Sequence, residues 1–184
     1  MIKSKEELKE YIASDNTYFR DKPKKARFWM SAVNDPESQI SKFTEFLRKE
    51  EYYANTNLKK GKLKILLRLY YQRRKNIYGN RLGILMDTNC FGKGLTIYHH
   101  GSIIVNPGAK IGSGCKLHGN NCIGNDGQSS GVPEIGDNVD IGFGASIIGD
   151  IKIANNIKIG AGAVVTKSFL EENITLVGVP ARKL

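Results

Sequence analysis

A repeat of six residues dominates the second half of the chain. Every sixth position from Val105 to Val165 carries an aliphatic residue, with one exception at Ser129. The aliphatic positions are Val105, Ile111, Leu117, Ile123, Ile135, Ile141, Ile147, Ile153, Ile159 and Val165. Neither a helix, with its apolar period of about 3.6 residues, nor a simple strand with a period of two produces this spacing. The period instead predicts short parallel strands joined by tight turns, in which successive coils stack and bury one another.

The first part of the chain follows a helical pattern. We therefore expect an N-terminal helical region over residues 1–80 and a repeat domain over residues 81–184. Three helices are expected. Ser4 and Glu7 form a capping box before the first helix, and the second begins at Pro36, after Asn34 or Asp35, and ends near Tyr53. The third runs from about Lys60 to Tyr78, with Gly79 as the stop.

The charge and cysteine content narrow the class of protein. The net charge of +10 attracts anions, which include nucleic acid, a membrane surface and a phosphorylated cofactor. The charged start MIKSKEELKE lacks the apolar core of a signal peptide, so we expect a cytoplasmic protein. Three cysteines without a CxxC pair suggest neither a disulfide framework nor a metal site.

Three stretches of the sequence resemble a known family. They are GKGLTIYHHGSIIVNP (92–107), the repeats of residues 135–165, and the ending VGVPARKL (177–184). These stretches resemble the left-handed parallel β-helix acyltransferases, especially the serine acetyltransferases and shorter members associated with surface polysaccharides. The resemblance, which covers about residues 79–184, implies a left-handed coil, a homotrimer and acetyl-CoA as the acetyl donor, with no metal.

The resemblance implies that His99 is the catalytic base. It lies six residues before Val105, where the repeat calls for an aliphatic residue, and an imidazole can take a proton from a hydroxyl near neutral pH. The alternative is a surface histidine in an irregular first coil. His100 and His118 are candidates for acceptor binding, since His118 follows about one coil later. Asp87 is the candidate to orient His99, or it only caps a turn.

Two departures from the serine acetyltransferases concern the acceptor. Tyr98 stands where the family has an acid before its histidine, and Gly131 and Val132 stand where it has an Arg-His pair. Both family groups would recognise serine, so their loss favours a carbohydrate, whose face Tyr98 can contact. Tyr98 could equally be a packing residue. The polar segment 125–134 is expected to leave the stack as a loop and to help shape the acceptor site.

The expected cofactor site rests on the resemblance as well. In the family, pantetheine meets the backbone of small turn residues between subunits, and basic side chains near the end meet phosphates. The corresponding residues here are Gly142, Phe143, Gly160 and Ala161 for pantetheine, and Lys167, Arg182 and Lys183 for the phosphates. Glycines needed only for bending, and cations that are simply solvated, would explain the same residues.

The sequence thus favours an acetyl-CoA-dependent O-acetyltransferase that acts on a hydroxyl of a sugar or a surface-polysaccharide precursor. The alternatives are a serine O-acetyltransferase of cysteine biosynthesis and a non-catalytic scaffold of hexapeptide repeats. The basic segment 58–75 is either a packed cap or a peripheral membrane contact. No nucleic-acid-binding module is recognisable, so a nucleic-acid partner is not expected.

Overall fold

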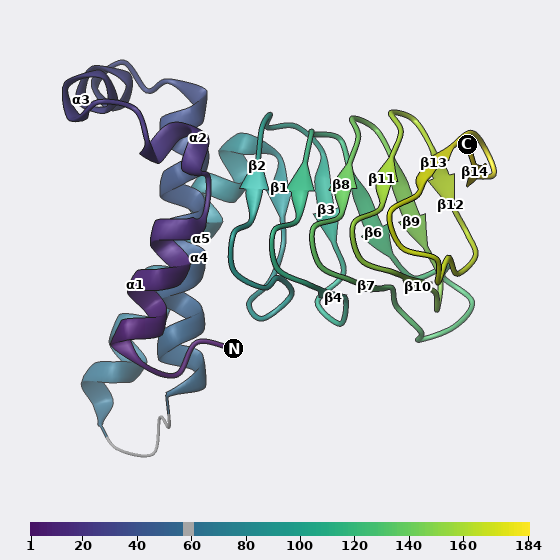
Figure 1. Cartoon of the computed structure of the whole chain (residues 1–184). Coiled ribbons are helices and arrows are strands. Elements are labelled where there is room, and N and C mark those ends of the chain that lie inside the picture. Colours follow the sequence, from purple (N-terminus) through teal and green to yellow (C-terminus); the bar gives the residue numbers. More distant parts are fainter. Residues whose placement is uncertain (57–60) are drawn as a thin grey trace.

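A helical region stands against one end of a stack of coils (Figure 1). The computed structural model describes residues 1–56 and 61–184 of the chain. The helices are α1 (Lys5–Ser14), α2 (Thr17–Arg20), α3 (Lys24–Ala32), α4 (Pro36–Asn55) and α5 (Lys62–Leu82). None of the helices within these described ranges is long and apolar enough to cross a bilayer.

The helix boundaries confirm the local signals and correct one of them. Ser4 Oγ accepts a hydrogen bond from Glu7 N at 3.0 Å, and Asp35 caps α4 as expected. The predicted stop at Gly79 is wrong, because α5 continues to Leu82 and ends at Gly83. A Cβ on Gly79 would lie 2.6 Å from Ile84 O, so this glycine allows the start of β1 to pack closely against α5. The predicted start at Lys60 lies outside the described residues, and α2 and α3 were not predicted.

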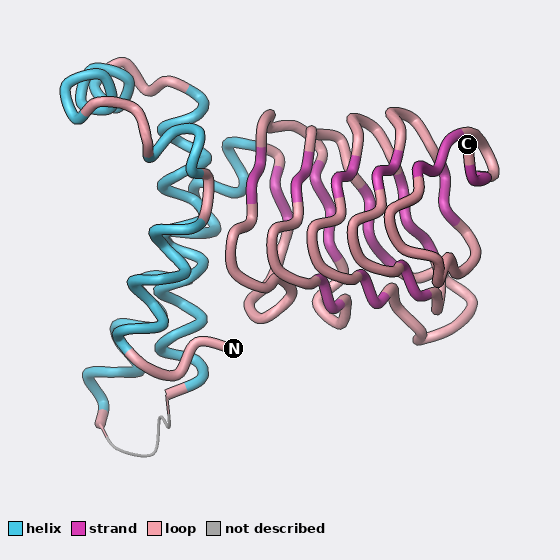
Figure 2. The backbone as a smooth tube through the Cα atoms, in the orientation of Figure 1, coloured by secondary structure: helices cyan, strands magenta, loops and turns pink. Residues whose placement is uncertain are grey.

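Fourteen short strands form the coils (Figure 2). They are β1 (Ile84–Leu85), β2 (Thr96–Ile97), β3 (Ile103–Val105), β4 (Lys110–Ile111), β5 (Lys116–Leu117), β6 (Cys122–Gly124), β7 (Glu134–Ile135), β8 (Asp140–Ile141), β9 (Ser146–Ile148), β10 (Lys152–Ile153), β11 (Lys158–Ile159), β12 (Val164–Val165), β13 (Thr175–Val177) and β14 (Arg182–Lys183). Each coil visits three sheets in turn, which makes the domain a parallel β-helix.

The three sheets differ in size. The five-stranded sheet has the order β1-β3-β6-β9-β12, and the three-stranded sheet has β10-β7-β4. The six-stranded sheet has the order β14-β13-β11-β8-β5-β2, in which β14 alone pairs antiparallel. Because every other pairing is parallel, residues at equivalent places in successive coils form columns along the stack.

The repeat positions fill the core of the coils. All ten aliphatic repeat residues are at most 5% exposed, whereas Ser129 lies in the exposed loop between β6 and β7. The inward phase predicted for His99 is wrong. Ile97, at 0% exposure, fills the inward position of that coil, and the longer corner 98–102 carries His99 to the surface.

The helical region closes the open edge of the first coil. Leu95 N donates to Asp15 Oδ1 at 2.9 Å, and Asn16 N donates to Leu95 O at 3.0 Å. Ile97 N then donates to Asn16 Oδ1 at 2.9 Å. Residues 15 and 16 therefore supply β2 with the hydrogen bonds that a preceding strand would otherwise provide, which leaves no open strand edge there.

Candidate active site

His99 lies at the corner between β2 and β3, beside the start of α4. The exposed His99, with Tyr98 and His100, lines a surface cavity of about 360 Å³. Asp35 and Glu37, at the N-terminus of α4, line the same cavity together with Pro36. The site therefore contains two carboxylates that the sequence did not assign to it. The sequence identified Asp35 only as a candidate helix start. Because Asp35 lies far from His99 along the chain, nothing in the sequence indicated that the two residues line the same cavity.

The column of residues next to His99 is narrow. The strand register continues from Ile97 through Leu117 and Ile141, so Gly119 and then Phe143 follow His99 along the stack. A Cβ on Gly119 would lie 3.3 Å from both His99 Cβ and Phe143 Cδ2. The φ of +109° at Gly119 also favours glycine. Gly119 thus lets the imidazole and the half-exposed phenyl ring approach across one coil.

Asn121 holds this corner in place and is 0% exposed. Its Oδ1 accepts from Gly119 N at 3.0 Å, and its Nδ2 donates to Gly142 O at 2.8 Å. A buried amide satisfied on both sides fixes the local backbone. The sequence carried a signal for it, since Asn121 interrupts a row of small or apolar residues six apart that includes Cys115 and Val139.

His118 lies beside Tyr98, one residue away from its predicted place beside His99. The coil from Thr96 to its partner Lys116 spans 20 residues, which sets this register. The ring centroids of Tyr98 and His118 are 4.7 Å apart, and His118 Nε2 lies 2.8 Å from Asp140 Oδ1. The Tyr18 ring covers the other side of Tyr98, with centroids 5.4 Å apart.

Tyr18 anchors this aromatic column to the backbone. Its hydroxyl donates to Ile97 O at 2.7 Å, and burial raises the pKa of the Tyr18 phenol well above its usual range. Tyr18 therefore stays a neutral hydrogen-bond donor at every ordinary pH. The Tyr98 ring packs between Tyr18 and His118, as the packing alternative for this residue predicted. Tyr98 also lines the His99 cavity.

Asp87 does not orient His99. It follows β1, where the chain turns from the five-stranded sheet toward the three-stranded sheet, whereas His99 lies at the corner after the six-stranded sheet. Asp87 Oδ1 accepts from Thr88 N at 2.8 Å and lies 3.6 Å from Lys75 Nζ. The prediction failed because a distance of twelve residues along this coil leads to a different corner.

The residues predicted for the cofactor fall into two groups. Gly142, Phe143, Gly160 and Ala161 continue the columns of Tyr98 and His99 down the stack. A Cβ on Gly142 would lie 2.7 Å from Ala161 N, and one on Gly160 would lie 3.0 Å from Val177 Cγ1. Close contact between coils, and not the bending that the alternative invoked, therefore explains both glycines without a ligand.

The predicted phosphate ligands are dispersed. Arg182 pairs with Val177, at the end of the column that contains Gly160. The Lys183 ammonium instead forms an ion pair with Glu171. Lys167 follows β12, at the turn toward the three-stranded sheet, and its ammonium lies 5.4 Å from the centre of the Phe169 ring. Arg182 therefore lies at the end of this column, with Lys183 next to it in β14, whereas Lys167 lies at another corner.

The loop 125–134 does not shape the His99 cavity within one chain, contrary to the prediction. It connects β6 to β7, at the corner between the five-stranded and three-stranded sheets. Backbone hydrogen bonds from Ser129 and Gln128 lower the pKa of Asp126 and organise the loop tip. A Cβ on Gly131 would lie 2.4 Å from Asp150 Cβ, so the loop packs against its own coil stack.

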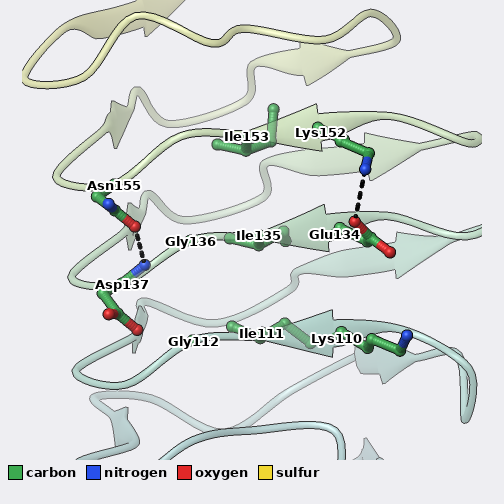
Figure 3. A pocket seen from close by; sticks show the side chains of 10 residues that line it. All are labelled: Lys110, Ile111, Gly112, Glu134, Ile135, Gly136, Asp137, Lys152, Ile153 and Asn155. Carbon is green, nitrogen blue, oxygen red and sulfur yellow. Dashed lines mark hydrogen bonds and ion pairs between the residues drawn. The ribbon is translucent and has the colours of Figure 1, made fainter.

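A second hollow, of about 500 Å³, lies on the three-stranded sheet (Figure 3). Two of its charged side chains form an ion pair, with Lys152 Nζ 3.0 Å from Glu134 Oε2, and the backbone N–H of Asp137 donates to Asn155 Oδ1 at 2.8 Å. This hollow carries no histidine and faces away from the His99 corner. In the described part of the chain, no group of three or more His, Cys, Asp or Glu side chains could hold a metal ion.

Comparisons with known proteins point to one group of enzymes. No protein-family model matches the chain. The serine acetyltransferase of Synechococcus elongatus is 34% identical over 93 residues, which are 50% of this chain and 38% of that protein. The chain thus spans less than half the length of the curated relatives it matches.

Solved structures extend the likeness over nearly the whole chain. The serine acetyltransferase of Neisseria gonorrhoeae superimposes with a TM-score of 0.68 at 27% identity, over 98% of this chain and 68% of that one. The structure of that enzyme in complex with serine gives a TM-score of 0.57 at 29% identity, over 80% of this chain and 56% of that one. The chain therefore has the left-handed parallel β-helix fold with an N-terminal helical region, and it is similar in sequence and structure to the acyltransferases built on this fold.

Proposed function

We propose that this protein is an acetyl-CoA-dependent O-acetyltransferase in which His99 is the general base. The observation that carries the proposal is the position of an exposed imidazole at the mouth of a cavity that two carboxylates line. His99 takes the proton of the acceptor hydroxyl as the oxygen attacks the thioester carbonyl. The C–S bond then breaks, the protonated His99 returns its proton to the leaving sulfur so that CoA departs as the thiol, and the acetyl ester is formed without an acetyl-enzyme.

L-Serine is the acceptor that the cavity supports best. Asp35 and Glu37 place negative charge beside His99, where it suits an ammonium group. Lys22 Nζ lies 2.5 Å from Glu37 Oε2 and offsets part of that charge, which leaves Asp35 as the main ammonium partner. The relatives and solved neighbours that are named serine acetyltransferases support the same acceptor, and so does the neighbour that holds serine.

A saccharide hydroxyl is the second candidate. Tyr98 presents a half-exposed ring to the cavity, and such rings pack against sugar faces. Gly131 and Val132 supply no charge for a carboxylate. A saccharide carries no ammonium group, however, and so leaves the carboxylates of Asp35 and Glu37 without a partner. We therefore rank this acceptor second.

The donor would lie along the column that runs from His99 past Phe143 to Ala161. Gly142 and Gly160 lie in the adjacent column, which begins at Tyr98, and Arg182 supplies a cation at the far end of that adjacent column. We further propose that three copies assemble, so that a neighbouring subunit completes this groove. The loop 125–134 of that neighbour would then reach the site that it does not reach in its own chain.

Thiol release from acetyl-CoA tests the proposal. Purified protein is assayed with L-serine, nucleotide sugars and free saccharides, alongside His99→Ala and the neighbouring His100→Ala. We expect turnover with L-serine and a fall in kcat of about 10²–10⁴-fold for His99→Ala only, because a positioned base contributes that much. Saccharide turnover alone would move the acceptor to the second candidate. Absence of both turnover and CoA binding would favour a scaffold.

A further inference from the structure

A histidine–carboxylate pair lies one coil beyond His99. His118 Nε2 lies 2.8 Å from Asp140 Oδ1, and the two side chains are about one-third exposed, at 38% and 32%. Within residues 1–56 and 61–184, the His118 ring forms no other hydrogen bond, so its Nδ1 has no protein partner there. Tyr98 forms the only aromatic contact of this ring in the same ranges and also lines the His99 cavity.

The charges around Tyr98 are asymmetric. Asp35 and Glu37 lie on the side of the helical region, and His118 lies on the side of the second coil. Lys116 and Lys158 flank Asp140 on the same face of the six-stranded sheet, so cations gather on the second side. The site thus offers anions for an ammonium group at one end and an imidazole among cations at the other.

The separation of these groups suits a small zwitterion. Residues 15 and 16 take the place of a strand beside β2, and β5 follows β2, so two strand spacings of about 4.8 Å each separate residues 15 and 16 of the helical region from the level of His118. An α-amino acid with one hydrogen bond of about 2.8 Å at each charged end spans roughly 9 Å, which is comparable. Its side-chain hydroxyl would then lie near the middle, where His99 is.

We infer that His118, held by Asp140, is a specificity-determining residue that binds the carboxylate of an amino-acid acceptor, while Asp35 and Glu37 bind its ammonium group. In the bound state the ring is an imidazolium that donates Nε2–H to Asp140 and Nδ1–H to the acceptor carboxylate. Such charge-assisted hydrogen bonds are stronger than neutral ones. This inference rests on the proposed acetyltransferase function and names the chemistry that selects its acceptor.

Three acceptors that differ by one charged group test the inference. L-Serine carries both groups, ethanolamine lacks the carboxylate, and 3-hydroxypropanoate lacks the ammonium group. Each is assayed at saturating acetyl-CoA with the wild type, His118→Gln and Asp140→Asn. Lys152→Gln serves as a control, because it removes one cation from the three-stranded sheet, far from this site. Thermal melting of each variant confirms that the fold is intact.

We expect His118→Gln to raise the KM for L-serine about ten- to a hundredfold, the effect of one hydrogen bond between charged groups. The KM for ethanolamine should change less than about threefold, because ethanolamine never makes that bond. Asp140→Asn should also raise the KM for L-serine. Lys152→Gln should change the KM for neither acceptor. Equal losses with both acceptors would make His118 a structural residue and overturn the inference.

The proposed function and the inference fail in different ways. If the wild type acetylates none of the three acceptors, the serine function itself is wrong. If the wild type acetylates L-serine and His118→Gln does so with an unchanged KM, the function stands and the inference alone is overturned.

Discussion

Replacing Arg48 with methionine tests how the helical region is attached to the coils. Arg48 is 0% exposed. Its Nε lies 2.8 Å from Asp15 Oδ2, and its Nη1 lies 3.0 Å from Glu51 Oε2. The guanidinium also donates to Phe91 O at 3.0 Å and to Gly92 O at 2.7 Å. One buried cation therefore joins α1 and α4 to the first coil.

Methionine fills similar space but leaves two buried carboxylates without a cation. Breaking a buried ion pair in this way costs about 3–5 kcal/mol, a large share of the roughly 5–15 kcal/mol that stabilises a typical domain. We therefore expect Arg48→Met to lower the free energy of unfolding by about 3–5 kcal/mol. A triple variant that adds Asp15→Asn and Glu51→Gln should recover most of this loss, because it leaves no unpaired charge in this cluster.

The contribution of Glu51 to the free energy of unfolding changes with pH in a defined direction. Burial raises the pKa of Glu51 above its ordinary value of 4.5, although the charge of Arg48 opposes the shift. The folded state then binds this proton more tightly than the unfolded state. Its contribution to stability is therefore fully present below pH 4.5 and is lost as the pH rises through the raised folded value. Removing Arg48 takes away the charge that lowers the pKa of Glu51, so it should make this loss of stability larger.

Urea unfolding followed by circular dichroism, at several pH values, measures these effects. The wild type, Arg48→Met and the triple variant are compared under identical conditions. A cost below about 1 kcal/mol for Arg48→Met would refute the argument that the buried charges depend on one another. A triple variant no more stable than Arg48→Met would show that the lost contacts to Phe91 O and Gly92 O dominate instead.

Two further substitutions test the coils. Gly119→Ala should cost about 1–3 kcal/mol in thermal melting and lower the acetylation rate, because it strains a positive φ and crowds His99. Gly149→Ala has a similar φ of +107° but an ordinary 3.8 Å contact, so it should cost stability without affecting the rate. Ile141→Ala, in the centre of the core, should cost about 2–5 kcal/mol in urea unfolding, whereas Ile104→Ala, at 47% exposure, should cost under about 1 kcal/mol. Equal rates for the two glycine variants, or equal costs for the two isoleucine variants, would contradict these assignments.

The sequence predicted the parts of the fold that depend on local repetition. The same inward position recurs after six residues on each side of a coil, so the period of six marks Ile123 or Ile147 as core without further information. Capping is local as well, which is why Ser4 and Asp35 were identified. The repeat predicted an inward position for His99, and this prediction was wrong because the corner 98–102 is longer than the repeat allows. The sequence does not show where such extra residues lie.

The candidate site was predictable only where it lies within one coil. Tyr98, His99 and His100 are neighbours in sequence and in the cavity. Asp87 is closer to His99 along the chain than Asp35 is, yet Asp35 lines the cavity and Asp87 belongs to another corner. In a coiled stack, the neighbours of a residue depend on the corner that it occupies. The number of residues between two positions predicts whether they share a corner only when the coil length is known.

One helix serves both stability and the site. The N-terminus of α4 brings Asp35 and Glu37 to the His99 cavity, and Arg48, further along the same helix, fastens it to the first coil. A helix transmits position along its length, because its backbone hydrogen bonds leave little freedom between these two points. The distance between the carboxylates and the imidazole therefore depends on an ion pair three turns away. The buried charges, costly by themselves, hold the candidate site in register with the coils.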